Sequence, residues 1–401
     1  MTNITLLGLG YIGLPTAVAL ANAGYTVSGF DTDPNIAQKL QDPSDAITHH
    51  EPELQRALKL ALASGNFQVT HKPAAAETYV LCVPTPITHD GSVVTPCLKA
   101  LRSAVSSIIN LLKTGDLIIV ESTVPVGTCE ILEKEIHLAR PDIRVHIAYC
   151  PERVLPGNIL FELKANNRII GGTSPEASRR AELVYRSFVE GEIRLTDSKT
   201  AELCKLAENS FRDVNIAFAN ELASIADKND VDPWELIHLA NEHPRVNILS
   251  PGPGVGGHCI AVDPWFLVSH YPNETRLIKT AREVNSEKPE RVARQIIAFA
   301  AEHGARAVAC LGLTYKADVT DTRDSPASQI TDLLRASGVD VLAVEPNLIE
   351  HPNYSLVPLQ EALAQADLAV ALVKHKAFQN DEALFKWSKP VFDACGLFRT
   401  R

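Results

Sequence analysis

A glycine pattern near the N-terminus constrains the fold of this chain more than any other feature. A short apolar segment, residues 4–7, runs directly into Gly8-x-Gly10-x-x-Gly13, and a helical pattern follows over residues 12–23. The first glycine permits a tight turn, the second lets a pyrophosphate approach the backbone, and the third lets the helix pack on the strand. Strand, turn and helix in this order predict a Rossmann-type crossover with a dinucleotide at the helix N-terminus.

The next predicted strand indicates which dinucleotide binds. It runs from Thr26 to Phe30 and is followed at once by Asp31. A carboxylate at this place binds the two ribose hydroxyls of adenosine and repels a 2′-phosphate. The sequence therefore predicts NAD, rather than NADP, as the cofactor.

Further strand and helix units follow in the first half of the chain. Strands are predicted at residues 79–83, 117–121, 145–150, 168–171 and 192–195. Thr85, Thr123 and Glu152 follow three of these strands, and ligands of doubly wound sheets lie beyond the carboxyl ends of the strands. The two threonines are equally consistent with turn formation or helix capping. We expect this NAD-binding domain to comprise residues 1–196.

A change of period marks the second domain. Residues 199–228 contain neither glycine nor proline and predict one long helix, capped by Asp197 or Ser198. Such a helix is about 45 Å long, which suits a connection between two domains. Two further helices are predicted at residues 275–285 and 290–303, separated by Pro289. We expect a helical central domain over residues 197–303.

Four polar residues follow one another along the long helix. Lys205 and Asn209 are four residues apart and share a face, and Arg212 and Asp213 lie one turn further on. For Arg212 and Asp213 the simpler interpretation is a solvated stripe with an ion pair. Lys205 and Asn209 are better candidates for a site, because the opposite faces of the helix carry the large apolar residues.

A glycine-rich loop presents a single thiol. In the stretch RVNILSPGPGVGGHCIAVDPWF, four glycines and two prolines precede Cys259, with His258 beside it and Asp263 four residues later. A thiolate is a strong nucleophile once its pKa is lowered, so the loop is a candidate catalytic site. Taken alone, it is also consistent with a linker that holds an incidental buried cysteine.

The last hundred residues predict a second, smaller doubly wound sheet. Strands are expected at residues 307–312, 339–344, 368–373 and 391–393, with helices at residues 325–336 and 359–366. This domain, residues 304–401, lacks a glycine pattern for a second dinucleotide. Its first loop, residues 313–324, carries Lys316 and Arg323 among three aspartates. These side chains are equally consistent with binding of a diphosphate and with salt bridges at the surface.

Composition excludes several classes of partner. The formal charge is −10 and no basic run occurs, which argues against a nucleic acid or an anionic membrane surface as the main partner. Eight cysteines are dispersed without a CxxC pair, so neither a metal site nor a disulfide framework is indicated. We therefore expect reduced thiols, a cytoplasmic location and no bound metal.

Motifs along essentially the whole chain resemble those of the UDP-glucose/GDP-mannose 6-dehydrogenase family. They read GLGYIGLP, VPTP, STVPVGT, CPERVLPG, ELCKLAENSFRDVNIAFANEL, GPGVGGHCIAVDP and LTYKADVTDTRDSP. The resemblance implies two Rossmann-like domains around a helical, dimerising centre, and a homodimer. It also implies a four-electron oxidation of a UDP-sugar C6 alcohol to a carboxylate, with two NAD consumed per sugar.

The versions CPERVLPGN, ENSFRDVNIAFANEL and HPRVNILSPGPGVGGHCIAVDPWF look most like those of members that oxidise UDP-N-acetyl-D-mannosamine for bacterial surface polysaccharides. UDP-N-acetylglucosamine is the runner-up substrate, because the two sugars differ only at C2. An ordinary two-electron hydroxyacid dehydrogenase would not need Cys259. A non-catalytic nucleotide-sugar binding protein is the alternative from another class.

The resemblance assigns roles to individual residues. The catalytic group is Cys259, Lys205, Asn209, Asp263, Glu152 and Thr123. The cofactor group is Gly8, Gly10, Tyr11, Ile12, Gly13, Asp31, Thr85, Thr123 and Arg323. The substrate group is Arg153, Val154, Lys205, Asn209, Arg212, Arg245, Gly256, His258, Lys316 and Arg399.

One position departs from the family pattern. UDP-glucose enzymes carry a second glutamate four residues after the position of Glu152, where this chain has Pro156. The departure favours Asp263, over a pair of glutamates, as the group that transfers protons. It also implies a differently shaped sugar pocket.

Overall fold

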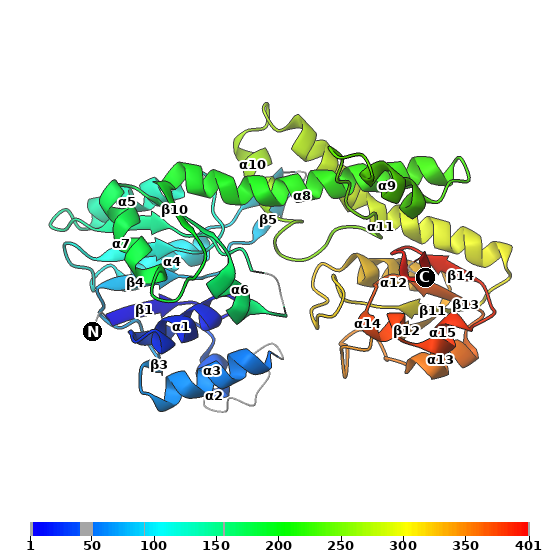
Figure 1. Ribbon diagram of the computed structural model, residues 1–401, viewed down its shortest axis with the longest axis horizontal. Helices are drawn as coiled ribbons and strands as arrows, with labels where there is room; N and C mark the ends of the chain where they lie inside the picture. Colours follow the sequence, from blue (N-terminus) through cyan, green and yellow to red (C-terminus); the bar gives the residue numbers. More distant parts are fainter. Residues whose placement is uncertain (1–2, 41–50, 92, 155–156, 400–401) are drawn as a thin grey trace. The chain divides into compact units, whose positions relative to one another are not determined.

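A computed structural model describes residues 3–40, 51–91, 93–154 and 157–399. The chain forms two compact units, Met1–Ala207 and Glu208–Arg401. Each unit contains one main sheet that is covered by helices on both faces (Figure 1). The predicted architecture of two doubly wound Rossmann-like sheets with a helical centre is confirmed.

The first unit is built on an eight-stranded sheet with the order β10-β9-β8-β7-β4-β1-β2-β3. Its strands are β1 (Asn3–Leu7), β2 (Thr26–Phe30), β3 (Phe67–Thr70), β4 (Thr78–Leu81), β7 (Leu117–Val120), β8 (His146–Tyr149), β9 (Arg168–Gly172) and β10 (Ile193–Asp197). A separate antiparallel hairpin joins β5 (Ile87–Asp90) to β6 (Val93–Pro96). Within the main sheet, each strand from β8 through β7, β4, β1 and β2 to β3 is parallel to its neighbours in this run, as βα units require. Strand β9, by contrast, runs antiparallel to β8.

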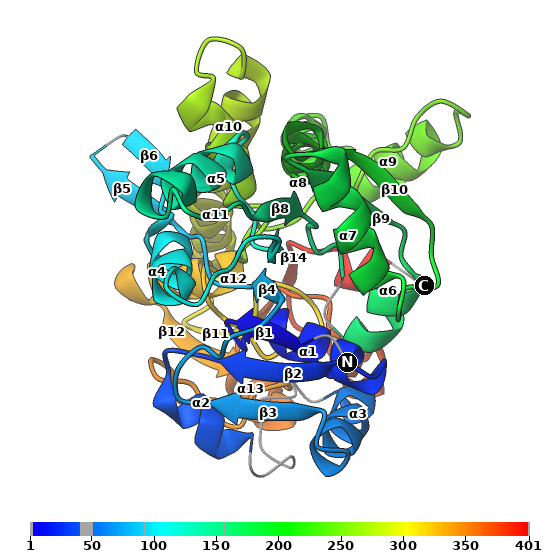
Figure 2. The ribbon, with the colours of Figure 1, turned by 90° about the vertical axis from the view of Figure 1, so that its left-hand side faces the viewer.

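Helices bury both faces of this sheet (Figure 2). They are α1 (Gly13–Asn22), α2 (Pro34–Lys39), α3 (Pro52–Ala63), α4 (Lys99–Ile108), α5 (Thr128–Ala139), α6 (Ile159–Ala165) and α7 (Pro175–Tyr185). One apolar cluster joins α1, α3, α6 and α7 to the sheet, and a second joins α4 and α5 to its other face. Helix α1 is buried over nearly its whole length, which explains why its sequence is apolar on every side.

The second unit carries a four-stranded parallel sheet with the order β12-β11-β13-β14. Its strands are β11 (Ala307–Leu311), β12 (Asp340–Val344), β13 (Leu368–Ala371) and β14 (Val391–Asp393). The helices are α9 (Pro233–Asn241), α10 (Asp263–His270), α11 (Arg276–Glu302), α12 (Pro326–Ala336), α13 (Leu359–Gln365), α14 (Lys376–Gln379) and α15 (Glu382–Phe385), with a short 3₁₀ turn η2 (Leu397–Arg399). Apolar clusters cover both faces of this sheet too.

The predicted long helix is confirmed as α8 (Ser198–Asp227), which is 30 residues long. Asp197 caps its first turn, because the Asp197 carboxylate accepts hydrogen bonds from the backbone N–H and the hydroxyl of Thr200 at 2.9 and 2.7 Å. The helix begins in the first unit and continues into the second.

The predicted break at Pro289 is wrong. Helix α11 continues through this residue and is 27 residues long. An internal proline removes one helical hydrogen bond and costs about 3 kcal/mol. Burial offsets this cost here, because residues on both sides of Pro289, among them Asn285, Val292 and Ile296, are enclosed by the unit.

Strand β3 and the β5–β6 hairpin were not predicted from the sequence. The segment FQVT of β3 is short and only its first residue is buried, so it carries little apolar periodicity. The reversal of β9 was also missed, because strand direction depends on pairing between distant segments.

Candidate active site

The turn between β1 and α1 has the shape that a bound pyrophosphate requires. Gly8 has a φ of 93°, and a Cβ atom at Gly8 would lie 2.6 Å from the Cys82 carbonyl oxygen. A Cβ at Gly13 would lie 1.8 Å from the Gly8 oxygen, whereas one at Gly10 would meet no atom within 4 Å. The turn is thus closed on its inner side and open at Gly10, beside the positive N-terminus of α1. These residues fit a dinucleotide.

The two residues between these glycines belong to the same structure. Ile12 is the N-cap residue of α1, and Tyr11 is partly buried against the core of the first unit. Both predicted cofactor residues therefore line the start of the helix.

Asp31 follows β2 and is held in one orientation by the backbone. Its Oδ2 atom accepts a hydrogen bond from the N–H of Leu9 at 2.8 Å, and its Oδ1 atom accepts one from the N–H of Asp33 at 2.9 Å. Each carboxylate oxygen has two lone pairs, so both oxygens can still accept a ribose hydroxyl. The geometry fits the predicted contact with adenosine.

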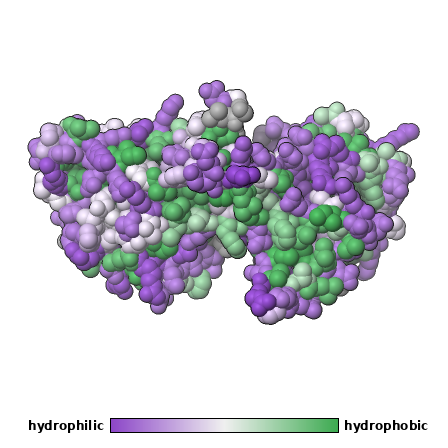
Figure 3. Space-filling model, turned by 90° about the horizontal axis from the view of Figure 1, so that it is seen from above, coloured by the Kyte–Doolittle hydropathy of each residue, from purple (hydrophilic) through white to green (hydrophobic). Residues whose placement is uncertain are grey.

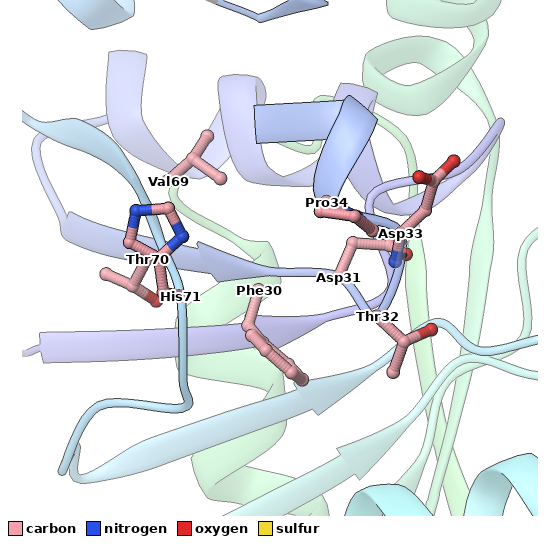
Figure 4. Close-up of a pocket in the computed structure, with 8 residues that line it drawn as sticks. All are labelled: Phe30, Asp31, Thr32, Asp33, Pro34, Val69, Thr70 and His71. Atoms are coloured by element: carbon pink, nitrogen blue, oxygen red, sulfur yellow. Dashed lines mark hydrogen bonds between the residues drawn. The ribbon is translucent and has the colours of Figure 1, made fainter. Parts of the chain in front are cut away.

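A pocket opens beside Asp31 (Figure 4). Its lining residues come from the end of β2, the start of α2 and the end of β3: Phe30, Asp31, Thr32, Asp33, Pro34, Val69, Thr70 and His71. Sequence reasoning found only Asp31 among them. The contribution of β3 was missed because the strand itself was not predicted.

Replacing Asp31 with asparagine is expected to weaken the preference for NAD over NADP by at least about tenfold, because the negative charge that faces a 2′-phosphate is removed. Asparagine keeps the size of the side chain and can still accept from Leu9. Steady-state kinetics with NAD and with NADP gives kcat/KM for each cofactor and so measures the change in preference. An unaltered ratio of the two kcat/KM values would show that Asp31 does not select the cofactor.

The structure brings together the two threonines that follow neighbouring strands of the first sheet. The Thr85 hydroxyl donates a hydrogen bond to the Thr123 carbonyl oxygen at 2.7 Å. Nearby, the Ser122 hydroxyl donates to the Val83 carbonyl oxygen, also at 2.7 Å. These bonds tie the loop after β4 to the loop after β7 at the carboxyl edge of the sheet, where a ligand is expected.

Lys205 of α8 lies against the loop that follows β8. Its ammonium group donates a hydrogen bond to the backbone carbonyl oxygen of Glu152 at 2.7 Å. In the same loop, Arg153 donates to the Asn167 carbonyl oxygen at 3.1 Å, and Val154 packs against the core. The structure therefore joins Lys205 to Glu152, and Arg153 and Val154 follow Glu152 in the same loop, whereas Pro156 lies outside the described residues.

Within the second unit, Asn209 and Asp263 are direct partners. The Asn209 side-chain amide donates to the Asp263 carboxylate, which is buried at the start of α10. The Asp263 N–H donates to the Cys259 carbonyl oxygen at 2.8 Å. Cys259 itself is exposed, and its backbone adjoins the Asn209–Asp263 pair at one end of the glycine loop. The alternative of an incidental buried cysteine is wrong.

The glycines of this loop are needed for close packing. A Cβ at Gly257, where φ is 83°, would lie 2.8 Å from the ring of Tyr315, and a Cβ at Gly256 would lie 2.2 Å from the Asp324 carbonyl oxygen. The loop is therefore pressed onto the segment that follows β11. This contact joins the candidate nucleophile to the first loop of the second sheet.

Charged groups connect the same two segments. The Nε2 atom of His258 lies 3.3 Å from the Asp321 carboxylate, which also forms two hydrogen bonds with the Arg323 guanidinium at 2.9 and 2.7 Å. Burial works to raise the pKa of Asp321, but Arg323 outweighs this effect and lowers it. Asp321 was not among the predicted site residues, although it links two of them.

The remaining predicted residues are more dispersed. Arg212, Arg245 and Lys316 are exposed. Arg399 forms an ion pair at 2.7 Å with Asp232, the N-cap residue of α9.

The expected solvated ion pair of Arg212 and Asp213 is wrong. Asp213 is fully buried and pairs with Arg282 of α11 at 2.6 Å, and it also accepts a hydrogen bond from Asn285 at 2.8 Å. Burial raises the pKa of Asp213, whereas Arg282 works to lower it. The pair joins α8 to α11 inside the second unit, and Arg212 remains at the surface.

The second sheet repeats the first crossover without its adenosine site. The Leu313 N–H donates to Glu345 at 2.8 Å, as the Leu9 N–H does to Asp31. Glu345, however, is enclosed with His375, whose Nε2 atom lies 3.1 Å away. Burial works to raise the pKa of Glu345, but His375 outweighs it and lowers the pKa. The Glu345 side chain is fully buried, so it is not open to a ribose in the way that Asp31 is.

The described residues, 3–40, 51–91, 93–154 and 157–399, contain neither a membrane-spanning helix nor a cluster of metal ligands. No helix in that part of the chain is long and apolar enough to cross a membrane. No group of three or more metal-ligating side chains occurs in the same residues.

Comparison with known proteins gives three matching family models. All three describe the UDP-glucose/GDP-mannose dehydrogenase family: its NAD binding domain matches residues 2–189, its central domain residues 199–287, and its UDP binding domain residues 309–400. The first model confirms the predicted NAD cofactor, and the third supports a UDP-linked substrate.

Similar individual proteins extend over nearly the same length. The UDP-N-acetyl-D-mannosamine dehydrogenase of Yersinia pestis is 47% identical, with 94% of each chain covered. An NDP-N-acetyl-D-galactosaminuronic acid dehydrogenase of Ralstonia nicotianae is 42% identical over 100% of this chain and 97% of the relative. The solved UDP-D-ManNAc dehydrogenase of Pyrococcus horikoshii is 37% identical with a TM-score of 0.90, covering 100% of this chain and 96% of that one. The chain belongs to the UDP-glucose/GDP-mannose dehydrogenase family.

Proposed function

We propose that this protein oxidises the C6 alcohol of UDP-N-acetyl-D-mannosamine to the carboxylate of UDP-N-acetyl-D-mannosaminuronate, a donor for bacterial surface polysaccharides. The observation that carries the proposal is the Asn209–Asp263 contact beside the exposed Cys259. Full-length similarity to UDP-N-acetyl-D-mannosamine dehydrogenases supports the choice of sugar.

The proposed reaction has two oxidations and one hydrolysis. NAD, when bound, accepts the hydride that leaves C6 in each oxidation. After the first oxidation, the Cys259 thiolate adds to the C6 aldehyde and forms a thiohemiacetal. After the second, C6 is a thioester of Cys259, and water attacks it to release the carboxylate and the thiol. One alcohol and one water thus give one carboxylate, with four electrons transferred.

The other catalytic residues serve charge and proton transfer. Lys205 and Asn209 are one turn apart on α8 and supply hydrogen-bond donors for the oxyanions that develop at C6. Asp263 takes and returns protons, and Thr123 assists. Glu152 remains the second proposed group for proton transfer, and its carboxylate pairs with Arg168 at 2.6 Å inside the core.

The remaining predicted residues stay binding proposals. For the cofactor they are Gly8, Gly10, Tyr11, Ile12, Gly13, Asp31, Thr85 and Arg323. For the nucleotide sugar they are Arg153, Val154, Arg212, Arg245, Gly256, His258, Lys316 and Arg399. The domain limits at residues 196 and 303 and a cytoplasmic location also remain predictions.

A direct comparison of epimers tests the choice of substrate. UDP-N-acetylmannosamine, UDP-N-acetylglucosamine and UDP-N-acetylgalactosamine are offered separately with NAD, and the absorbance of NADH is followed. We expect kcat/KM to be at least about tenfold higher for UDP-N-acetylmannosamine. Equal or faster turnover of the galactosamine sugar would instead favour the function named for the Ralstonia relative. No turnover of any sugar would favour a non-catalytic nucleotide-sugar binding protein.

We further propose that α8 forms the centre of a homodimer. Figure 3 shows hydrophobic residues among hydrophilic ones on one face of the molecule. On α8, Phe211, Phe218 and Ile225 are 69, 50 and 57% exposed. They follow one another at seven-residue intervals and share a helix face, opposite Asp213 and Asn220, which bond to α11. Three large apolar side chains in one row suit a second copy of the same helix.

Replacing Phe218 with glutamate is expected to convert the dimer into a 43.6 kDa monomer at micromolar concentration, because a charge would be buried in the interface. Light scattering coupled to gel filtration measures the mass. The same change at Phe161, an exposed residue of α6, serves as the control and should leave the mass unchanged. A dimer with glutamate at residue 218 would contradict this interface.

A further inference from the structure

A cluster of buried ionisable groups lies below the carboxyl edge of the first sheet. Glu121 follows β7, Glu152 follows β8 and Arg168 begins β9. Their exposed fractions are 4, 8 and 3%, respectively. Arg168 donates a hydrogen bond to the Glu152 carboxylate at 2.6 Å. None of these contacts was expected from the sequence, and Arg168 was not among the predicted site residues.

The Arg168 guanidinium is held from several sides. One of its NH groups faces the Cys150 sulfur at 3.7 Å, and its central carbon lies 4.8 Å from the centre of the Tyr185 ring and 5.8 Å from that of Phe188. Burial works to lower the pKa of Arg168, but Glu152 outweighs it and raises the pKa. The ion pair with Glu152 and the contacts with Cys150 and the two rings together fix the position of the Arg168 guanidinium.

Glu121 belongs to the same cluster but has neutral partners. Its carboxylate accepts hydrogen bonds from Thr16 at 3.2 Å and Cys82 at 2.9 Å, and it also bonds to the Tyr185 hydroxyl. Burial raises the pKa of Glu121, against the opposing effect of Arg168. Because Thr16 lies on α1, the cluster connects the predicted NAD helix with the loop that contains Glu152.

The orientation of Glu152 decides what this residue offers to Lys205. The Glu152 carboxylate points into the core, where it also accepts a hydrogen bond from the Arg153 N–H at 2.6 Å. The backbone carbonyl of the same residue accepts from Lys205 at 2.7 Å. Because Arg168 fixes the Glu152 side chain, it also fixes the Glu152 carbonyl oxygen that binds the Lys205 ammonium group.

Stability alone is a weak reason for such a pair. Replacing a buried ion pair by apolar side chains of similar volume is often neutral or stabilising, because two charges need not be removed from water. A defined position of the backbone, by contrast, requires a partner with fixed geometry, and the planar guanidinium supplies one.

We propose that Arg168 is a positioning residue of the active site, which acts through Glu152 to hold Lys205 in place. The inference rests on the proposed function of Lys205. Arg168 touches neither the sugar nor NAD in this account. Its loss should therefore lower the rate of turnover and leave the binding of both ligands largely intact.

Two substitutions and one matched control test this inference in the full-length protein. Arg168→Met is expected to lower kcat by about 100-fold, because misplacing a catalytic group by about 1 Å costs a factor of this size. Arg168→Lys keeps the charge but loses the planar fork, so kcat should fall by only about tenfold. The KM values for NAD and the UDP-sugar should change less than about threefold in both variants.

The control is Ile170→Ala, which removes buried apolar volume from the same face of β9 and keeps both partners of the Arg168–Glu152 ion pair. It should lower the melting temperature and leave kcat within about twofold of the unaltered protein. A kcat for Arg168→Met within about twofold of the unaltered protein would overturn the inference. The inference would also be overturned if kcat fell in proportion to the melting temperature in both Arg168→Met and Ile170→Ala. If the methionine variant does not fold, Arg168→Lys decides: an unaltered kcat overturns the inference.

A crystal structure of the same variant separates this inference from the proposed function. We expect the Glu152 carbonyl oxygen to move beyond hydrogen-bond distance of Lys205 in the Arg168 variant. This readout needs no turnover, so it remains decisive even if none of the UDP-sugars proves to be a substrate. An unchanged Lys205–Glu152 bond would overturn the positioning role.

Discussion

Replacing Cys259 with alanine is expected to reduce the formation of the uronate by at least about 1000-fold while NAD binding stays intact. Loss of a nucleophile that forms a covalent intermediate has effects of this size or larger. The loop backbone should tolerate the change, because Cys259 is exposed and the neighbouring glycines make the close contacts. Chromatography with mass detection measures the uronate, and calorimetric titration measures NAD binding.

Cys310 provides the matched control for Cys259. It lies in β11, and burial raises its pKa to about 12, so it forms almost no thiolate at neutral pH. Cys310→Ala should therefore leave the yield of uronate unchanged. A normal uronate yield from Cys259→Ala would remove the covalent role of this thiol.

Replacing Lys205 with alanine is expected to lower kcat by about 100- to 1000-fold, with a change in the KM for the UDP-sugar of less than about fivefold. Removing one preorganised donor from a developing oxyanion has an effect of this magnitude. The contact with the Glu152 carbonyl is also lost, so the loop after β8 keeps its Arg168 contact but no longer bonds to α8 at this point. Steady-state kinetics separates the two parameters.

Lys199 is the matched control on the same helix. It is exposed in the first turn of α8 and pairs with Glu130 at 2.8 Å. Lys199→Ala should leave both kinetic parameters within about twofold. If Lys205→Ala instead raised KM by as much as it lowered kcat, Lys205 would be a binding residue rather than a stabiliser of the transition state.

Sequence reasoning succeeded where structure depends on neighbouring residues. The turn after β1, with its closed glycines and open Gly10, could be predicted because each glycine acts within one strand–helix unit. The position of Asp31 depends on two short elements, and the cap of α8 on one of two adjacent candidates, Asp197 and Ser198, of which Asp197 makes the contact. For such features, spacing along the chain determines the contact.

Sequence reasoning failed where partners are distant along the chain. Asp213 pairs with Arg282 in another helix, and Pro289 remains helical because its surroundings are buried. The inward orientation of Glu152 depends on Arg168, which begins the neighbouring strand β9. No local periodicity indicates these contacts, since each arises from packing between different elements of the chain.

The number of NADH molecules formed per sugar consumed tests the central claim most directly. A limiting amount of UDP-N-acetylmannosamine is converted to completion with excess NAD, while NADH is measured by absorbance and the remaining sugar nucleotide by chromatography. Two successive oxidations at C6, with the aldehyde kept on Cys259 between them, predict two NADH and one uronate for every sugar. One NADH per sugar, with the aldehyde as the released product, would contradict the account.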